Sequence, residues 1–542
     1  MNRRLDITVA LLLMLAATAV YRITWPGNHG DTEDAYSYAS SLVPGRANYA
    51  LWDRNHNLYL PLTKLTFNAA RRAAPSLQPF EWLLGISTIC GALSIAGVYL
   101  FCRHRQQLSA GLSGITALML LCSYGFWRYS CTPEIYTLSV FLVLATLYQV
   151  FRTDTGLAGC IWAGVLGALA VAIHIGNAPA VFLVATAWTW KRKNAGRAAI
   201  YLGIVLALTL VHYALPAVFP RQVRPLPAFM VSTGPAVEVC LQPYASLPAS
   251  ARLVRGLLCL PQAWIAPNFL LGFGVFRRWL TAVFAHRNME EELFLGSAFQ
   301  GDPLLLGACV TLILLVVAGS WLILALLREP RRSASVDGIS GWLLVWVALN
   351  AAMVLWKEPD NPELWIFPLP PLLLWIAGTA GRILGPVRAL RHLATVMVLL
   401  AVHNWLGGMR MLADPETDLN RRIADVVQTV TGEDDIAITG RGPISRTYLE
   451  YYTRTHTIDL QAQLANRRGL VLPADPEGRH IYATSDVFDP PTWLEHSAPK
   501  LYGRMTDWAS RHKSIFTPVA SNDLVVVYVW KGSPPDPNEE NK

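Results

Sequence analysis

Residues 5–21 read LDITVALLLMLAATAVY and residues 30–38 read GDTEDAYSY, so an apolar run is soon followed by three carboxylates. An apolar run of about this length can cross a bilayer as a helix. Asp31, Glu33 and Asp34 would then lie at the membrane edge, where ionisable groups are costly to desolvate and therefore tend to mark function. The alternative is a solvated loop in which Asp31 or Asp34 caps a helix. The distribution of charge along the rest of the chain decides between these two interpretations.

The composition is that of a multi-span membrane protein. Of the 542 residues, 53% are hydrophobic and 15% are charged, whereas a soluble domain carries about 25% charged residues. The net charge of +8 could indicate nucleic-acid binding. The Lys and Arg residues instead form short clusters between apolar blocks, so we exclude a nucleic-acid partner. The eight cysteines show no CxxC spacing, which argues against a zinc or disulfide framework.

About eleven apolar blocks are predicted to cross the membrane. They lie near residues 5–21, 83–101, 108–126, 135–151, 157–173, 178–190, 198–219, 304–327, 342–355, 365–376 and 392–406. Lys and Arg cluster on alternate connections, near residues 103–105, 152, 191–197, 328–332 and 382–391. The positive-inside rule therefore places the amino terminus in the cytoplasm and the carboxyl-terminal part outside. For the first block, a cleaved signal peptide is the alternative.

The predicted fold is an all-α polytopic membrane domain followed by a small extracytoplasmic α/β domain. The membrane domain spans residues 1–412, with a first outer loop at 23–82 and an outer or interfacial segment at 220–303. In that segment, Pro261 and Pro267 interrupt residues 257–280, which we expect to cross the membrane either twice or not at all. Residues 413–532 alternate between helical and strand patterns, which predicts an α/β domain. Strands are expected near 435–439, 456–459, 480–484 and 524–530, and helices near 420–429 and 444–452. The Pro- and Glu-rich residues 533–542 are expected to be disordered.

Side chains that could take part in catalysis or substrate binding fall on the predicted outer face. The candidates are Asp31, Glu33, Asp34, Tyr36, Arg54, His56, Arg128, Glu134, Tyr136, His174, Lys357, Glu358 and Glu363. A carboxylate in this position can act as general base on a hydroxyl, while Arg, Lys or His can neutralise a phosphate leaving group. The sequence contains no P-loop and no GxGxxG between a strand and a helix. A lipid-linked donor is therefore favoured over a nucleotide sugar.

Four short motifs resemble those of the GT-C superfamily of polyprenyl-phosphate-sugar-dependent membrane glycosyltransferases. They are DAYSY at 34–38, HNLYLPL at 56–62, Trp127 with EIY at 134–136, and EPDNPELW at 358–365. Protein O-mannosyltransferases and the aminoarabinose transferase of lipid A belong to this superfamily. The resemblance implies an enzyme of the bacterial inner (plasma) membrane whose catalytic base lies in the first outer loop. Because the acids are spaced Asp-x-Glu-Asp rather than as an adjacent Asp-Glu pair, the choice among Asp34, Asp31 and Glu33 stays open, with Asp34 preferred.

Several alternatives to this interpretation stay open. For individual residues they are a helix-start acid for Glu134, a core histidine for His174, a surface pair for Arg54 and His56, and interface anchors for Arg128 and Lys357. For the whole chain they are a transporter or flippase of a lipid-linked saccharide, and a non-catalytic membrane assembly protein. We assign no metal ligand and no cofactor, and leave a divalent cation open. The expected partners are a polyprenyl-phosphate-linked sugar, membrane lipid and an acceptor hydroxyl on a protein, lipid or glycan.

Overall fold

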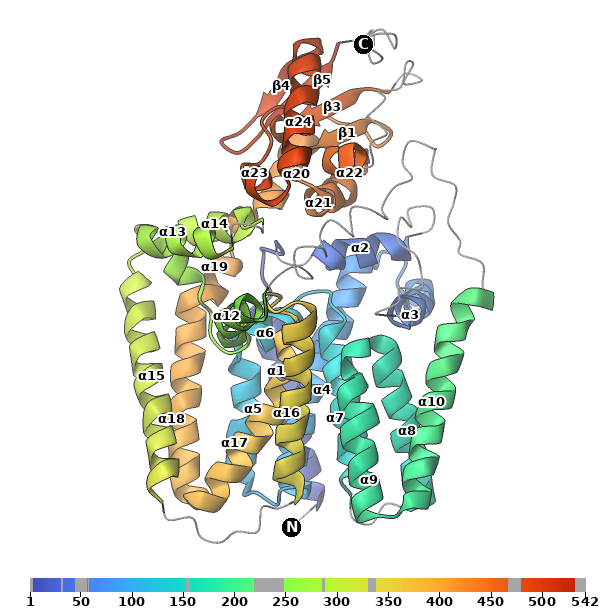
Figure 1. The fold of residues 1–542 in the computed structure, drawn as a ribbon, viewed down its shortest axis with the longest axis vertical. Coiled ribbons are helices and arrows are strands. Elements are labelled where there is room, and N and C mark those ends of the chain that lie inside the picture. The colour runs from blue at the N-terminus through green and yellow to red at the C-terminus, as the bar shows by residue number, and fades with distance from the viewer. Residues whose placement is uncertain are drawn as a thin grey trace.

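The chain folds into a helical bundle with a sheet-containing domain stacked on one end (Figure 1). This architecture comes from a computed structural model, which describes residues 3–30, 33–43, 56, 58–152, 156–218, 248–284, 288–329, 338–465 and 479–531. The predicted disordered tail at 533–542 lies outside these residues. The amino-terminal end of the chain lies at the end of the bundle remote from the sheet domain (Figure 1).

Within the described residues, seven helices are long and apolar enough to cross a membrane. They are α1 (Arg3–Ile23), α4 (Pro79–His104), α10 (Ala195–Val218), α15 (Leu305–Arg328), α16 (Gly338–Lys357), α17 (Leu369–Ile383) with the turn before it, and α18 (Pro386–Asn404) with its continuation. The other predicted blocks are also helical, but shorter or broken. They are α5 (Ala110–Cys122) with α6 (Tyr124–Ser130), α7 (Tyr136–Val150), α8 (Leu157–Ile173), and the π-helix Pro179–Ala185 with α9 (Thr186–Arg192). By length and composition, seven described helices, or eight with the bent pair, qualify as spans, and the predicted count of about eleven would require the shorter helices to cross as well.

The block predicted at 108–126 is not one straight helix. The axes of α5 and α6 meet at 69°, because Ser123 is extended at the junction and the backbone N–H of Tyr124 donates to the carbonyl of Trp264 instead of continuing the helix. The side-chain amide of Asn404 donates to the carbonyl oxygens of Cys122 and Trp264, at 2.7 Å each. Contacts from distant segments therefore take up the hydrogen bonds that the break frees.

Short helices cover the end of the bundle that faces the sheet domain. The predicted first loop contains α2 (Glu33–Leu42) and α3 (Tyr59–Ala73), and the segment before α15 contains α12 (Ala249–Cys259), α13 (Gly274–Val283) and α14 (Glu290–Ser297). Two 3₁₀ turns join α12 to α13, and the first begins at Leu260, directly before Pro261. No helix in the described part of this segment is long enough and apolar enough to count as a candidate membrane span.

The carboxyl-terminal domain is built on a five-stranded sheet of order β2-β1-β3-β5-β4. Its strands are β1 (Ile436–Thr439), β2 (His456–Asp459), β3 (Ile481–Thr484), β4 (Phe516–Ser521) and β5 (Val526–Trp530). The first three are parallel, whereas β5 is antiparallel to both β3 and β4. The strands expected at 435–439, 456–459, 480–484 and 524–530 correspond to β1, β2, β3 and β5, and β4 is an addition. Because β2 lies on one side of β1 and β3 on the other, the crossover connections run in opposite directions, and the topological switch point lies between β1 and β3.

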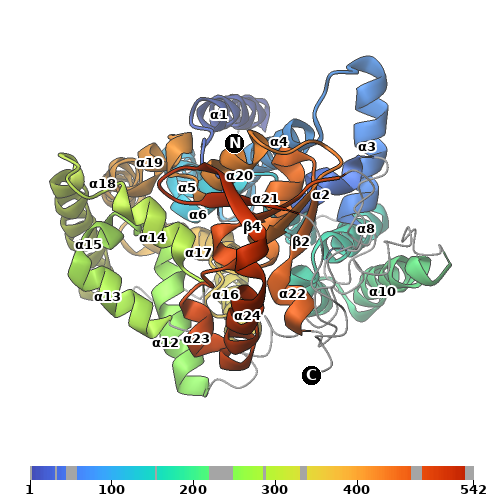
Figure 2. The same ribbon diagram turned by 90° about the horizontal axis from the view of Figure 1, so that it is seen from above.

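Helices pack on both faces of the sheet because side chains alternate along each strand. On one face, α20 (Leu419–Gln428) and α21 (Pro443–Thr453) cover Ala437 and Val527. On the other face, α24 (Pro499–His512) covers Ile436 and Ile438. The connecting helices are α22 (Leu460–Ala465) and α23 (Trp493–Ser497). Seen from above, α20 and α21 lie over the middle of the bundle, next to α2 (Figure 2).

Basic side chains from several connections gather at the amino-terminal end of the bundle. Asp6 of α1 is buried and pairs with Arg103 at 2.7 Å, between Oδ1 and Nε. Arg105, on the same connection, donates from Nε to the carbonyl of Tyr148 near the end of α7. Lys193 lies close enough to Arg105 and Arg152 to interact with their charges. This end is therefore strongly positive, and the sheet domain lies at the opposite end (Figure 1).

Candidate active site

Asp34 lies in the first turn of α2 and faces Tyr38, one helical turn later. Residues four apart on a helix are neighbours, and the Tyr38 hydroxyl donates to Asp34 Oδ2 at 3.2 Å. The Tyr38 ring packs edge-on against Tyr59 at the start of α3, with 5.2 Å between centroids, and lies 6.4 Å from the ring of His56. The carboxylate preferred as base is thus held next to the second motif of the same loop.

His56 stacks in turn on a histidine that is distant in the sequence. The rings of His56 and His174 lie 5.0 Å apart and are tilted by 38°. His174 follows α8 and is buried. Its ring also contacts Tyr136 at the start of α7 and Phe367 before α17, at 5.7 Å and 4.8 Å between centroids. The first loop therefore meets two further connections of the bundle at these rings.

The segment after α16 completes the arrangement. The Tyr136 hydroxyl donates to Glu363 Oε2 at 2.6 Å, a short bond of the kind formed with a charged acceptor. The Asn361 side-chain amide donates to Glu358 Oε2 at 3.0 Å and to Glu363 Oε2 at 3.4 Å. Lys357 Nζ lies 3.9 Å from Glu358 Oε1, and its side chain is 31% exposed. Its ammonium group can therefore reach a bound anion.

Electrostatic interactions join the remaining candidates to these contacts. Asp34 and Glu134 both lie within electrostatic range of Tyr59 and Tyr136, and Glu134 is fully buried. We call the whole set the polar–aromatic cluster. Its members are Asp34, Tyr38, His56, Tyr59, Glu134, Tyr136, His174, Lys357, Glu358, Asn361, Glu363 and Phe367. The cluster combines carboxylates, imidazoles and an ammonium group at the end of the bundle that faces the sheet domain.

His174 is a neutral hydrogen-bond donor in this cluster. Burial, together with the positive charges of His56 and Lys357, holds the pKa of His174 well below its usual range. The backbone N–H of Gly176 donates to His174 Nδ1 at 2.9 Å. The proton of the neutral ring therefore sits on Nε2, which is left to donate.

Tyr36 and Arg128, which the sequence assigns to the substrate site, lie in a different environment. Tyr36 is fully buried and points away from Asp34, because residues two apart lie on opposite sides of a helix. Its ring packs on Tyr448 of α21, 4.3 Å away between centroids. Arg128 is buried on α6 and donates from Nη1 to the carbonyl of Asn28 at 2.7 Å. Both residues pack against the first loop or its neighbours, and their contact with substrate stays a prediction.

Some predicted site residues lie outside the described part of the chain, and the structure adds site residues that were not named in advance. Asp31 and Arg54 fall outside the described residues, and so does the side chain of Glu33. Tyr38, Tyr59 and Asn361 lie within the quoted motifs but were not named as site residues, and Phe367 was not predicted. Tyr38 could have been found from its i+4 spacing to Asp34, whereas Phe367 carries no signal in the sequence because only the tertiary packing brings it to His174. Among the described residues, no three His, Cys, Asp or Glu side chains come together as a metal site.

No family model and no curated protein matches the chain. Solved structures do: the crystal structure of ArnT from Cupriavidus metallidurans bound to undecaprenyl phosphate is similar with a TM-score of 0.54 at 12% identity. The similarity covers 97% of this chain and 99% of ArnT. The fold is that of ArnT. The similarity in fold extends over both chains almost completely.

Two other transferases show a weaker similarity. The archaeal oligosaccharyltransferase AglB from Archaeoglobus fulgidus, in complex with an inhibitory peptide and a dolichol-phosphate, has a TM-score of 0.43 at 11% identity and covers 94% of this chain and 72% of its own. The arabinofuranosyltransferase AftD from Mycobacteria has a TM-score of 0.44 at 16% identity and covers 98% of this chain and 40% of its own. The ArnT comparison is therefore the one on which the fold assignment rests.

Proposed function

We propose that the chain is an integral membrane glycosyltransferase that moves a sugar from a polyprenyl-phosphate donor to an acceptor hydroxyl on the outer face of the membrane. The observation that carries the proposal is the polar–aromatic cluster. Asp34, His56, His174, Lys357 and Glu363 come from segments far apart in the sequence and meet at one end of the bundle. The undecaprenyl phosphate bound to ArnT supports the choice of donor class.

The orientation follows from the two ends of the bundle. The basic end, which carries Arg103, Arg105 and Lys193, belongs in the cytoplasm by the positive-inside rule. The cluster and the sheet domain would then face the periplasm or the exterior. About eleven crossings satisfy this arrangement if the shorter helices α7, α8 and α9 and the bent pair α5–α6 also span. A bacterial inner membrane is the setting that fits the donor class.

In the proposed reaction, Asp34 acts as general base. It takes the proton of the acceptor hydroxyl as that oxygen attacks the anomeric carbon of the sugar. A bond forms between the acceptor oxygen and the anomeric carbon, the bond from that carbon to the phosphate oxygen breaks, and polyprenyl phosphate leaves with the bonding electrons. The Nε2–H of His174, with His56 and Lys357, stabilises the negative charge on the leaving phosphate. Arg54 is a further proposed phosphate contact.

The remaining acids fit recognition of the sugar. Glu134, Glu358 and Glu363 can accept hydrogen bonds from sugar hydroxyls, and Tyr136 holds Glu363 in place through its 2.6 Å bond. Asp31 is the second candidate for the base, and Glu33 the third. A transporter or flippase without catalysis is not favoured, because it would place ionisable side chains near the midplane of the bundle, whereas the cluster joins acids and bases at its end.

The test is turnover of lipid-linked donors by purified protein in nanodiscs, measured as release of polyprenyl phosphate from a panel of polyprenyl-phosphate sugars. Asp34→Asn keeps the size of the side chain and removes its basicity, so turnover should fall ~10²–10⁴-fold with binding of undecaprenyl phosphate little changed. Asp31→Asn should have a smaller effect and Glu33→Gln the smallest. Asp507→Asn, an exposed acid on α24, is the matched control and should turn over normally.

Three outcomes are informative. If Asp31→Asn is inactive and Asp34→Asn is active, the base is misassigned and the reaction class stands. If all three acid variants turn over as the wild type does, the loop acids are not catalytic. Turnover of a soluble nucleotide sugar with none of the lipid-linked donors would contradict the proposed donor.

A further inference from the structure

The helix that carries Asp34 has two functional sides. On one side Asp34 and Tyr38 face the polar–aromatic cluster; on the other, Tyr36 faces the sheet domain. With only 10 residues, α2 is too short to be stable on its own, since isolated helices below ~12–15 residues are marginal in water. The position of Asp34 therefore depends on what α2 packs against.

The partner of α2 is a set of tyrosines on α21. The ring of Tyr36 lies 4.3 Å from Tyr448, 5.0 Å from Tyr451 and 5.4 Å from Tyr452, between centroids. The hydroxyl groups of Tyr36 and Tyr452 share a hydrogen bond of 2.8 Å. The Tyr452 ring is also covered by the guanidinium group of Arg421 on α20, 3.9 Å from the ring centroid. Tyr452 is thus held between α2 and α20.

The chain entering α2 is clamped by the same domain. The backbone N–H of His29 donates to Asp418 Oδ2 at 2.9 Å, and the carbonyl of His29 accepts from the Tyr448 hydroxyl. The Asn28 side-chain amide donates to the carbonyl of Thr417 at 2.6 Å, while the Asn28 carbonyl accepts from Arg128 in the bundle. The residues just before the acidic trio are therefore fixed between α6 and the sheet domain.

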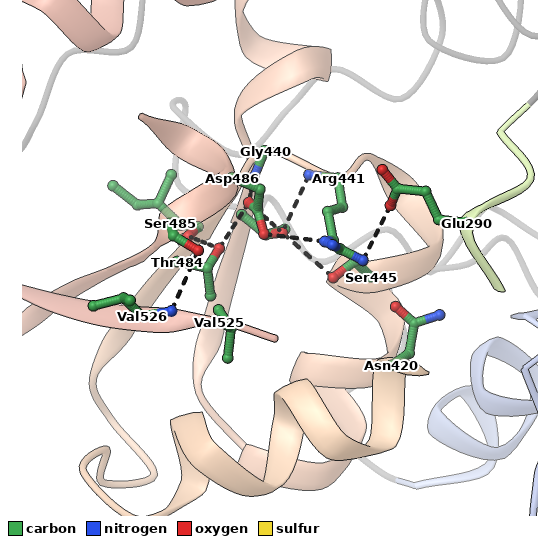
Figure 3. Close-up of polar contacts among 12 residues, drawn as sticks. Glu290, Asn420, Gly440, Arg441, Ser445, Thr484, Ser485, Asp486, Val525 and Val526 are labelled. Carbon is green, nitrogen blue, oxygen red and sulfur yellow. Dashed lines mark hydrogen bonds and ion pairs between the residues drawn. The ribbon is translucent and has the colours of Figure 1, made fainter. Parts of the chain in front are cut away.

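A second contact sets the orientation of the sheet domain on the bundle. In the turn after β1, Arg441 Nη1 lies 3.0 Å from Glu290 Oε2 of α14, and Arg441 Nε lies 3.3 Å from Asp486 Oδ2 after β3 (Figure 3). On the same side, the Asn420 side-chain amide donates to Glu291. Two separate attachments, at α2 and at α14, leave the domain little freedom to rotate.

We infer that the sheet domain positions the catalytic base, and that Tyr36 and Tyr452 are the positioning residues through which it does so. The inference rests on the proposed function of Asp34. The domain need not touch the donor; it fixes the α2 face that presents Asp34. Misplacement of a catalytic group by about 1 Å can cost ~10²-fold in rate, so losing the ring that supports α2 should lower kcat and leave donor binding unchanged.

A double-mutant cycle on kcat tests this, with Tyr452→Ala measured in the wild type and in Asp34→Asn. If Tyr452 acts through Asp34, its truncation should lower kcat roughly 10–100-fold in the wild type and have almost no further effect once the base is gone. Tyr452→Phe retains the ring and should recover most of the loss. Tyr502→Ala, the same truncation on α24 away from α2, is the control and should leave kcat near the wild-type value.

The readouts separate a positioning role from a folding defect. Each variant is first assayed for binding of undecaprenyl phosphate, which should match the wild type. If Tyr452→Ala fails to fold, the same cycle is run with Tyr36→Phe, which removes only the hydroxyl partner of Tyr452 and should lower kcat by a few fold. Equal losses in both backgrounds, or no loss in the wild type, would overturn the positioning role, whereas a lowered residual kcat of Asp34→Asn would leave the proposed base standing. A fully active Asp34→Asn would overturn the proposed base and the positioning role together.

Discussion

Single side chains in the polar–aromatic cluster have distinct tasks because their protonation states differ. His174 is neutral and can only donate from Nε2, since Nδ1 is occupied by the Gly176 N–H. Lys357 is partly exposed and offers a full positive charge, with Glu358 as its ion-pair partner at 3.9 Å. A pair of this length at such exposure is weak, so an incoming phosphate can compete for the ammonium group. Lys357 is therefore the residue on which affinity for the donor phosphate should depend most.

Lys357→Gln should weaken binding of undecaprenyl phosphate by about 10–100-fold, because a hydrogen bond to a charged group contributes about 1.5–3 kcal/mol. The Kd is measured with the protein in nanodiscs at moderate salt, and the wild-type affinity should fall more steeply with salt than that of the variant. Lys191→Gln, an exposed residue at the basic end of the bundle, is the matched control. An unchanged Kd for Lys357→Gln would remove this residue from the phosphate site.

The sequence predicted which residues lie close together better than it predicted what each of them contacts. Charge, topology and the resemblance to the GT-C motifs selected a set of residues that the structure brings together: Asp34, His56, Glu134, Tyr136, His174, Lys357, Glu358 and Glu363. Tyr36 and Arg128 were selected by the same signal, an ionisable or aromatic residue at a membrane edge. That signal does not distinguish a contact to substrate from a contact to another domain, because both require a buried polar or aromatic group.

At the level of secondary structure, the break between α5 and α6 shows what an apolar pattern cannot reveal. Residues 108–126 have the composition of one span, and nothing local in the sequence requires the 69° bend. The bend depends on Asn404, which donates to the carbonyl groups of Cys122 and Trp264 and accepts from the N–H of Ala266 at 2.8 Å. One fully buried amide thus pairs three backbone groups from two distant segments.

Asn404→Ala should therefore destabilise the protein by about 2–4 kcal/mol, since each buried backbone group left without a partner costs about 1–3 kcal/mol and nearby groups recover part of that loss. The free energy of unfolding is measured in mixed micelles by titration with a denaturing detergent. Thr395→Val, on the exposed side of the same helix, should change stability by less than about 0.5 kcal/mol. Equal stability of the two variants would show that the break is held by other contacts.

At the scale of the whole molecule, the free energy of unfolding should depend on pH through His29, which lies where the first loop contacts the sheet domain. Burial and the neighbouring Arg128 charge lower the pKa of His29 to about 3, whereas an unfolded histidine titrates near ~6.5. The folded protein therefore keeps His29 neutral while the unfolded chain binds a proton. The stability from His29 is complete above about pH 6.5 and is lost as the pH falls toward 3, by up to about 1.4 kcal/mol per pH unit.

His29→Phe keeps a ring against Phe80 and keeps both backbone hydrogen bonds, but cannot titrate. The stability difference between wild type and variant should shift in favour of the variant between pH 7 and pH 4.5. Thermal unfolding midpoints of both proteins at several pH values measure it. The pKa of Asp418 is raised by burial and acts in the opposite direction, but it does so in both proteins and cancels in the difference. Parallel pH curves would contradict the role of His29.

Charge asymmetry between the two ends of the bundle gives the last prediction, which concerns topology. Lys193 follows six proposed crossings, the last of which is α9, and Trp530 follows five more. A reporter fused after Lys193 should therefore be cytoplasmic and one fused after Trp530 outside.

A third fusion after Arg328 tests the segment from α12 to α14. This fusion should be cytoplasmic if the segment stays on the outer surface, because only α10 and α15 then cross between Lys193 and Arg328. Alkaline phosphatase and green fluorescent protein fusions give opposite signals at each site and check one another. If the Lys193 and Trp530 fusions report the same side, the cluster and the sheet domain cannot both face outward. An outside signal after Arg328, together with a cytoplasmic signal after both Lys193 and Trp530, would mean that residues 257–280 cross once.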